Sequence, residues 1–490
     1  MPAPAKLVLV VIDGMKPAML ERAAHSGQAP TLAMLMQRGM YSDQCVAAYP
    51  SVTPVCAATI ATGVGPDRHR IPAMNWYHRE EARYVEYGSS LSASRRFGIS
   101  RQLIDTVYNM NRAHLSPDVE TVFEMLDDAD LRTAGTTYLM YRGRHRHEVA
   151  RDTALSLLAS TVMRHPVMGP REFFYADIFA SRRTGCRSQL GMPGVRDRHT
   201  GCVGAHLVEH QLFDFLLFSL PDNDAYSHRN GPHAQVASIS EADRQLERLV
   251  HAGGGPDDFL SDHAVIVMAD HSHASVEQAI ELHELFGEFS VLAPSGRRAG
   301  DAEIALCPSQ RSAMVYALEA RGHSELVPRI VECALSSSGV DMVMWRDGAS
   351  AVIARGDARL HFAPGGDVSD LRGQRWLVQG ELDVIDGRLE EGRLYCEAYP
   401  DALARVWSAL NCPNAGEVLL SAAPGYEFAD WGGVAHVGGG AHGSLHRSDS
   451  LAPLIVTGIP DPRPPGGEQW SIADIQPLIG AHFGLGEDGT

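Results

Sequence analysis

At 490 residues the chain is longer than one ordinary hydrophobic core requires, so we expect one large domain with insertions or two domains. Its composition, 44% hydrophobic and 21% charged, is that of a globular protein and argues against wholesale disorder. The formal net charge of −18 argues against a nucleic-acid polymer as partner, because an acidic surface repels a polyphosphate backbone. A small anionic substrate is still compatible with this charge, since bound divalent cations would dominate the local field.

The first apolar run of the chain, Leu7–Ile12, ends at Asp13. It is too short for the core of a signal peptide with a cleavage site, so we expect a buried first strand. No stretch of roughly 20 apolar residues follows, which predicts no membrane span. The cysteines are dispersed without a C-x-x-C pair, which favours reduced thiols in a cytoplasmic protein; they are Cys45, Cys56, Cys186, Cys202, Cys307, Cys333, Cys396 and Cys412.

Three later runs, Phe213–Leu220, Ala264–Ala269 and Leu454–Thr457, are continuously hydrophobic, which is typical of strands buried on both faces. Between two of them, Ser238–His251 carries an apolar stripe and ends at Gly253–Gly255, which predicts a helix. This alternation predicts an α/β fold with a mostly parallel central sheet and helices on both of its faces.

Two regions break the alternation. Residues 72–205 are polar, and helix-like stretches at Val119–Asp127 and Asp152–His165 indicate a helical cap. Residues 340–400 show strand-like pieces at Asp341–Trp345, Ala351–Arg355 and Ala358–Phe362, then a turn at Pro364-Gly365-Gly366. We expect the chain to return to the main sheet near Glu417–Ser421. The predicted division is a core over 1–335 including the cap at about 72–205, a small β-rich insertion over 336–415, and a C-terminal return over 416–490.

Ionisable residues follow several of the predicted strands. Asp13 closes the first, Asp222 and Asp224 follow Phe213–Leu220, and Asp270 and His271 close the next. One aspartate at a strand end is usually a helix cap or turn, but several such ends indicate a site, because ligands bind outside the carboxyl ends of strands in open α/β sheets.

Two histidines extend this set. On a helical turn, Asp224 and His228 would share a face and could reach one metal ion. His442 lies in the glycine-rich segment Gly438–Gly443, which alone could equally be a flexible linker.

A candidate nucleophile lies in Tyr49–Gly63. Thr53 precedes Pro54 and a small apolar run, so we expect Thr53 to be the N-cap of a helix with Pro54 at its first position. Capping alone would explain both residues. A helix N-terminus also attracts phosphoryl groups, and a threonine hydroxyl beside a divalent metal can be deprotonated near neutral pH.

In their order the motifs resemble those of the alkaline phosphatase superfamily, most closely its nucleotide pyrophosphatase/phosphodiesterase branch. The resemblance rests on V-I-D-G with Asp13, the Thr53 segment with T-I-A-T-G and P-D-R-H, P-D-N-D-A-Y-S-H-R-N-G-P, A-D-H and G-G-A-H-G. It spans about residues 6–75, 213–275 and 432–458. No single motif is specific, but their order along the chain is.

The resemblance implies an alkaline phosphatase-like fold and two divalent metal ions, usually Zn²⁺. The implied ligands are Asp224, His228 and His442 for one ion and, for the other, Asp13, Asp270, His271 and Thr53 Oγ. It implies that Thr53 attacks phosphorus in line and that water then cleaves a phosphothreonine intermediate. We therefore expect a hydrolase of small phosphoric esters, with phosphodiesters or nucleotide pyrophosphates favoured.

Three residues extend or depart from the family pattern. Asn75 lies one residue later than the asparagine that donates to a phosphoryl oxygen in the diesterase branch, and we predict a substrate-binding role for it. Ser272 and His273 follow A-D-H, where the branch usually has a glycine. His273 could donate a hydrogen bond to a metal ligand without contacting the metal, although we expect it to be an exposed loop histidine. Lys16 could face the phosphate, although a surface lysine is expected.

Other reactions of the superfamily fit less well or stay open. Sulfatases need Cys or Ser as nucleophile and an Arg four residues later, where this chain has Thr53 and Ala57, and phosphoglycerate mutases use Ser. A phosphomonoesterase or a phosphonoacetate hydrolase-like enzyme that cleaves a C–P bond stays open. A non-catalytic metal-binding protein is the alternative from another class, against which the complete set of ligands and nucleophile argues. The sequence does not indicate an oligomeric state.

Overall fold

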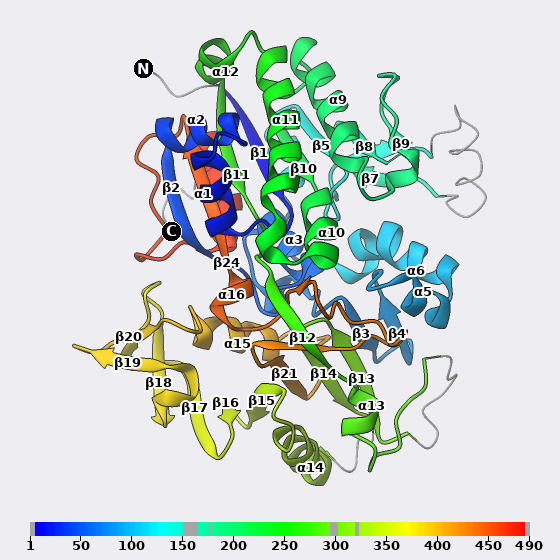
Figure 1. Ribbon diagram of the computed structural model, residues 1–490, viewed down its shortest axis with the longest axis vertical. Coiled ribbons are helices and arrows are strands. Elements are labelled where there is room, and N and C mark those ends of the chain that lie inside the picture. Colours follow the sequence, from blue (N-terminus) through cyan, green and yellow to red (C-terminus); the bar gives the residue numbers. More distant parts are fainter. Residues whose placement is uncertain (1–4, 150–164, 177, 295–301, 319–322, 486–490) are drawn as a thin grey trace.

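The computed structural model describes residues 5–149, 165–176, 178–294, 302–318 and 323–485 (Figure 1). Within these residues, two large sheets of eight and nine strands lie one above the other along the longest axis of the molecule. A small sheet of β22 (Gly425–Phe428), β12 (Ala274–Ile280) and β23 (Gly440–Ala441) lies where they meet. The predicted α/β class is confirmed.

The eight-stranded sheet contains all four strands predicted from continuous apolar runs. Its strands, in spatial order, are β2 (Met40–Val46), β24 (Leu451–Thr457), β11 (His263–Met268), β1 (Lys6–Ile12), β10 (Phe215–Leu220), β5 (Thr133–Thr136), β8 (Glu172–Tyr175) and β9 (Phe179–Ala180). β1 pairs in parallel with both β10 and β11, whereas β24 runs antiparallel to β11 and β2. The sheet is therefore mostly parallel, as predicted.

Burial on both faces explains the unbroken apolar runs. Along β1, Leu7, Leu9 and Val11 face one hydrophobic core, while Val8, Val10 and Ile12 face another. Because each fully buried aliphatic side chain contributes roughly 1.5–3 kcal/mol, neither face of this strand tolerates polar residues.

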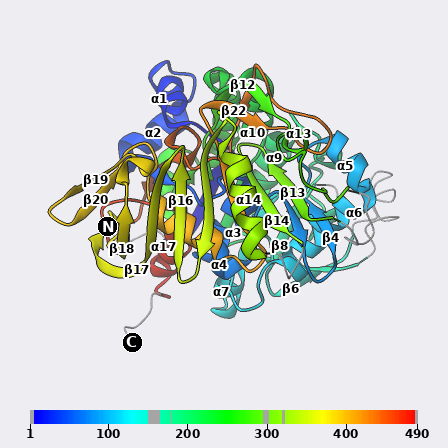
Figure 2. The same cartoon turned by 90° about the horizontal axis from the view of Figure 1, so that it is seen from below.

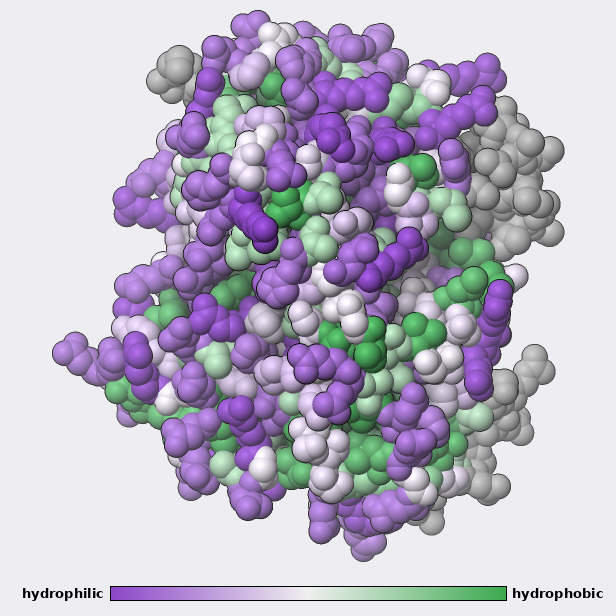
Figure 3. All heavy atoms as spheres, viewed as in Figure 1, coloured by the Kyte–Doolittle hydropathy of each residue, from purple (hydrophilic) through white to green (hydrophobic). Residues whose placement is uncertain are grey.

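Helices cover both faces of this sheet. One face packs against α1 (Pro17–His25), α2 (Pro30–Arg38), α9 (Arg196–Glu209), α11 (Val236–Ala252) and α12 (Pro256–Asp262), and the other against α3 (Thr53–Thr62), α7 (Val122–Asp128) and α17 (Ile475–His482). The predictions of helices at Ser238–His251 and Val119–Asp127 are thus confirmed as α11 and α7. Hydrophilic residues cover α9, α11 and α12 on the face seen in Figure 3, and the hydrophobic patches lie mainly in its lower half.

The nine-stranded sheet is larger than the predicted insertion. Figure 2 shows it from below, with α14 (His323–Leu335) across its outer face. Its strands are β13 (Ile304–Ser309), β14 (Ser312–Ala317), β21 (Val418–Ala422), β15 (Val340–Asp347), β16 (Ser350–Arg355), β17 (Ala358–Ser369), β20 (Arg393–Cys396) and β19 (Gly387–Glu390), with β18 (Arg375–Gly380) paired to β17.

Two details of this sheet differ from the sequence predictions. The predicted return to the main sheet near Glu417–Ser421 is wrong, because β21 pairs with β14 and β15, and the chain rejoins the main sheet only at β24. Gly365 and Gly366 do not end a strand; β17 continues through them with an irregularity in its pairing to β18. The division into core, insertion and C-terminal return stays a prediction.

The segment 72–205 is only partly a cap, because β5, β8 and β9 from this segment extend the main sheet. The hairpin of β3 (Asn75–His78) and β4 (Arg83–Glu86) and the helices α5 (Leu91–Phe97) and α6 (Ile99–Ile104) lie beside the junction of the two large sheets (Figure 1). The helix predicted at 152–165 falls almost wholly outside the described residues.

One cysteine pair corrects the expectation of reduced thiols. Cys186 and Cys202 form a disulfide with their Cα atoms 5.8 Å apart, since the loop before α9 folds back on that helix. Among the described helices, none is long and apolar enough to cross a membrane.

Candidate metal centre

The ionisable residues predicted to form a site lie at one edge of the eight-stranded sheet. Asp13 directly follows β1, and Asp270 and His271 follow β11. After β10 the chain enters α10 (Asp222–Asn230), which places Asp224 and His228 one helical turn apart. Because β1, β10 and β11 are parallel, their carboxyl ends bring these side chains to the same edge.

Thr53 reaches this edge from α3. It is the first residue of the helix and Pro54 the second, while Val52 is the N-cap, so the predicted N-cap position of Thr53 is wrong by one residue. The apolar side chain of Val52 makes no capping hydrogen bond. The Thr53 hydroxyl instead lies 3.2 Å from His271 Nε2, at a helix N-terminus that favours anions.

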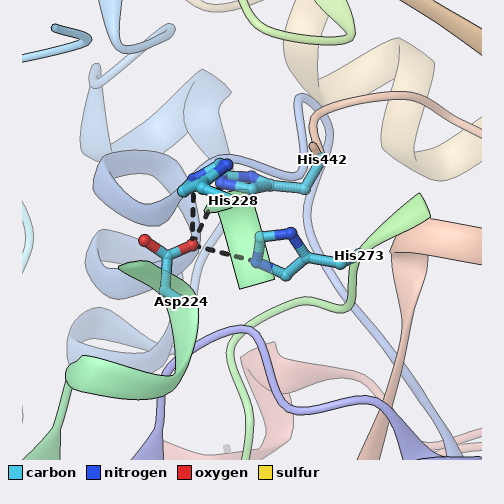
Figure 4. A group of neighbouring side chains, drawn as sticks. All are labelled: Asp224, His228, His273 and His442. Atoms are coloured by element: carbon cyan, nitrogen blue, oxygen red, sulfur yellow. Dashed lines mark hydrogen bonds and ion pairs between the residues drawn. The ribbon is translucent and has the colours of Figure 1, made fainter. Parts of the chain in front are cut away.

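A first group of donors surrounds one oxygen of Asp224. Asp224 Oδ1 lies 3.2 Å from His228 Nε2, 3.0 Å from His273 Nε2 and 3.4 Å from His442 Nε2 (Figure 4). One ligand atom from each of the four residues can be chosen so that all lie within 4.8 Å of one another. Three imidazoles and one carboxylate are a donor set that binds zinc.

Backbone carbonyls fix the orientation of three histidine rings. The Nδ1 atoms of His228 and His442 lie 2.8 Å and 2.9 Å from the carbonyl oxygens of Gly440 and Ser51. His271 Nδ1 lies 3.1 Å from the carbonyl oxygen of Ser272. When Nδ1 carries the proton, the lone pair of Nε2 is free to bind a metal ion, which is the common arrangement in metal-binding histidines.

A second group adjoins the first and consists of Asp13, Asp224 and His271. Asp270 stands beside it, with Oδ2 3.4 Å from His271 Nε2 and Oδ1 accepting hydrogen bonds from the backbone N–H groups of Gly14 and His271. The rings of His271 and His442 stack at 3.7 Å, so the two groups are in contact.

The electrostatics of the centre favour a bound cation. Burial, with repulsion from Asp270 and Asp224, raises the pKa of Asp13 well above its ordinary value, and burial raises the pKa of Asp270 to about 6. Burial also lowers the pKa values of His271 and His442 to about 4, which keeps both imidazoles neutral. Asp13 Oδ1 is buried and has no hydrogen-bond partner among the described residues. Crowded carboxylates, neutral imidazoles and an orphaned oxygen together fit a divalent metal ion.

The structure brings together seven predicted site residues, which are Asp13, Thr53, Asp224, His228, Asp270, His271 and His442. Asn75 is buried in β3, where its Nδ2 donates to the carbonyl of Val85 and its backbone N–H donates to Ser309 Oγ. Its role in substrate binding stays a prediction.

Three further residues were misjudged or missed by the sequence analysis. His273 is fully buried in the first group instead of exposed in a loop. Lys16 is not a plain surface lysine, because its Nζ donates to the carbonyls of His273 and Ser448 behind the centre. His436 stacks on His228 at 4.1 Å and pairs with the buried Glu427. Only the close repeat of histidines in A-D-H-S-H could have indicated His273.

Solved structures share this architecture. Phosphonoacetate hydrolase from Sinorhizobium meliloti, in complex with phosphonoformate, is similar with a TM-score of 0.57 at 17% identity, covering 98% of this chain and 97% of that one. Murine ectonucleotide pyrophosphatase/phosphodiesterase 5 is similar with a TM-score of 0.57 at 12% identity, covering 98% and 95%. An inactive variant of that mouse protein in complex with AMP is similar with a TM-score of 0.57 at 11% identity, covering 98% and 95%.

At such identities these likenesses show the fold alone. No curated protein sequence matches the chain. The sequence profile described as type I phosphodiesterase/nucleotide pyrophosphatase, however, matches residues 7–445, which include the residues of the metal centre and the nine-stranded sheet but not β24 of the main sheet. The chain therefore belongs to the type I phosphodiesterase/nucleotide pyrophosphatase family of phosphoric-ester hydrolases.

Proposed function

We propose that the protein hydrolyses phosphodiesters or nucleotide pyrophosphates through a covalent intermediate on Thr53, with two divalent metal ions, Zn²⁺ in each position. The observation that carries the proposal is the place of the Thr53 hydroxyl, at the start of α3 and 3.2 Å from His271 Nε2 beside the buried donor groups. Asp224, His228 and His442 would hold one ion, and Asp13, Asp270, His271 and Thr53 the other.

The reaction proceeds in two displacements at phosphorus. Bound metal ions supply Lewis acidity, which lowers the pKa of a neighbouring hydroxyl and offsets charge on phosphoryl oxygens. Thr53 Oγ, having released its proton to solvent, forms the new O–P bond while the bond to the leaving oxygen breaks, and the departing group takes up a proton from solvent. Water then attacks the same phosphorus, the Thr53 Oγ–P bond breaks, and Thr53 regains a proton. The N-terminus of α3, where Thr53 lies, would favour the negative phosphoryl oxygens through the dipole of the helix.

Rates on three substrates test the reaction class. We expect the zinc-loaded protein to hydrolyse bis(4-nitrophenyl) phosphate faster than 4-nitrophenyl phosphate. Phosphonoacetate is the third substrate, because the hydrolase from Sinorhizobium meliloti shares the fold. Faster cleavage of the monoester or of phosphonoacetate would overturn the diester preference. No cleavage of any substrate by protein of measured zinc content would favour the non-catalytic alternative.

Substitution of Thr53 tests the nucleophile. Thr53→Ala should lower kcat for the diester by at least ~10³-fold, because the intermediate cannot form. Stability should change by no more than about 1.5 kcal/mol, since the substitution removes the hydrogen bond between the hydroxyl and His271 Nε2. Thr62→Ala is the matched control at the other end of the same helix, where the hydroxyl donates only to the carbonyl of Ala58. Undiminished hydrolysis by Thr53→Ala would show that another group attacks phosphorus.

A further inference from the structure

We propose that His273 is a fourth protein ligand of the metal ion that Asp224, His228 and His442 hold. This inference rests on the proposed metal centre and adds a residue to the ligands that the family resemblance implies. It would give this ion four protein donors, whereas catalytic zinc usually has three and an open position.

His273 is placed by pairing between distant segments. It directly precedes β12, whose first residue, Ala274, pairs with Ala441 of β23 in antiparallel fashion. His273 and His442 are therefore opposite neighbours, and both side chains are buried. Lys16 Nζ donates to the His273 carbonyl at 3.1 Å and so restrains its backbone.

The distances around Asp224 Oδ1 match a tetrahedral metal site. With zinc–ligand bonds of 2.0–2.1 Å, two ligands of a tetrahedron lie ~3.3–3.4 Å apart. The Nε2 atoms of His228, His273 and His442 lie 3.2, 3.0 and 3.4 Å from this single oxygen. The Nε2 atom of His273 is thus about as far from Asp224 Oδ1 as those of the two histidines that the family pattern includes (Figure 4).

Gly14 provides the room for the His273 ring. A Cβ atom at this position would lie 2.5 Å from His273 Nε2, closer than side chains tolerate. Gly14 also has a φ of +64°, which other residues rarely adopt. The glycine of V-I-D-G therefore keeps open the space that Nε2 occupies.

The competing arrangement is a hydrogen bond from His273 Nε2 to Asp224 without contact to the metal. In that case His273 would only orient a ligand, and its removal would weaken metal binding by the 10–100-fold typical of outer partners. A direct ligand should cost more than this, and its Nε2 must lie at bonding distance from the ion.

A crystal structure of the zinc-loaded wild-type protein makes the first test. We expect Nε2 of His273 at about 2.0–2.1 Å from the zinc ion near Asp224. A separation above about 3 Å, or no zinc beside Asp224, overturns the proposal. Because this test uses the unaltered chain, it does not depend on the folding of a variant.

Zinc affinity, measured by competition with a chromophoric chelator, makes the second test. His273→Ala should weaken binding at one of two zinc sites by more than 100-fold, whereas a smaller loss overturns the proposal. His251→Ala, which removes an exposed histidine of α11, is the control and should leave both affinities unchanged. If zinc contacts His273 but no phosphoric ester is hydrolysed, only the proposed function is refuted. If phosphoric esters are hydrolysed but His273 does not contact zinc, only the role of His273 as a ligand is refuted.

Discussion

Replacing Arg311 by methionine should destabilise the protein by about 3–5 kcal/mol, because it leaves a buried carboxylate without its cation. Arg311 and Asp449 are both fully buried, and Arg311 Nη1 lies 2.6 Å from Asp449 Oδ1. Burial opposes the charged form of Asp449, yet the charge of Arg311 holds its pKa below the ordinary value. Since whole domains are stable by only ~5–15 kcal/mol, the loss is a large fraction of the total.

The pair ties together the segments behind the metal centre. The Arg311 guanidinium also donates to the carbonyls of Tyr426 and Ala423, and its backbone N–H donates to the carbonyl of His442 at 2.9 Å. The Asp449 carbonyl accepts from the N–H of Ser272. We therefore expect Arg311→Met to weaken zinc binding as well as to lower stability.

Equilibrium unfolding in urea, followed by tryptophan fluorescence, measures the effect when the slope m is unchanged. Arg38→Met is the matched control, because the Arg38–Asp257 pair is exposed and should contribute no more than about 1 kcal/mol. Arg311→Met/Asp449→Asn should recover part of the loss, since no unpaired charge then remains buried. A loss in Arg311→Met no greater than in Arg38→Met would refute the reasoning, as would a double variant less stable than the single one.

Three further changes are expected to act through local geometry or charge. Gly14→Ala should weaken zinc binding by tenfold or more, whereas Gly27→Ala, which has a similar φ but open space around it, should not; equal affinities in a chelator competition would contradict this. Burial raises the pKa of Asp243 to about 6, so this group should lower the free energy of unfolding of the wild type by ~2 kcal/mol as pH rises from about 4 to 7. Asp243→Asn should remove that part of the slope in urea unfolding at a series of pH values, and an unchanged slope would count against a raised pKa. Cys186→Ser removes a disulfide between cysteines 16 residues apart and should lower the free energy of unfolding by about 3 kcal/mol. The pairing would be contradicted if the unfolded wild-type protein had as many free thiols before reduction as after it.

Strands buried on both faces could be predicted from sequence because the signal is local. Leu7–Ile12 and Ala264–Ala269 are apolar at every position, because alternate side chains of each strand point into the hydrophobic cores on the two opposite faces of the sheet. The assembly of the site then follows from topology, as parallel strands deliver the residues after their carboxyl ends to one edge. Asp13 and Asp270 could be placed together on this ground alone.

The remaining features depend on pairings that no local pattern encodes. The burial of His273 results from the pairing of β12 with β23, whose residues are far apart in the chain. The apolar pattern of Val418–Ala422 predicts a strand but does not indicate to which of the two large sheets it belongs. It belongs to the nine-stranded sheet because it pairs with β14 and β15. The N-cap was misplaced because Pro54 is compatible with either of the first two positions of a helix.

The place of β24 in the main sheet has a consequence for the order of assembly during synthesis. β2, which is made long before β24, pairs only with β24 among the described strands, and β24 in turn pairs with β11. Until residues 451–457 leave the ribosome, β2 has no partner among the described strands and one edge of β11 stays open to other chains. Chains that end before Leu451 should therefore aggregate, and a chaperone that shields strand edges should raise the yield of chains that contain β24. Protection of the amides of β2 from hydrogen exchange should appear only once residues 451–457 have been made and paired.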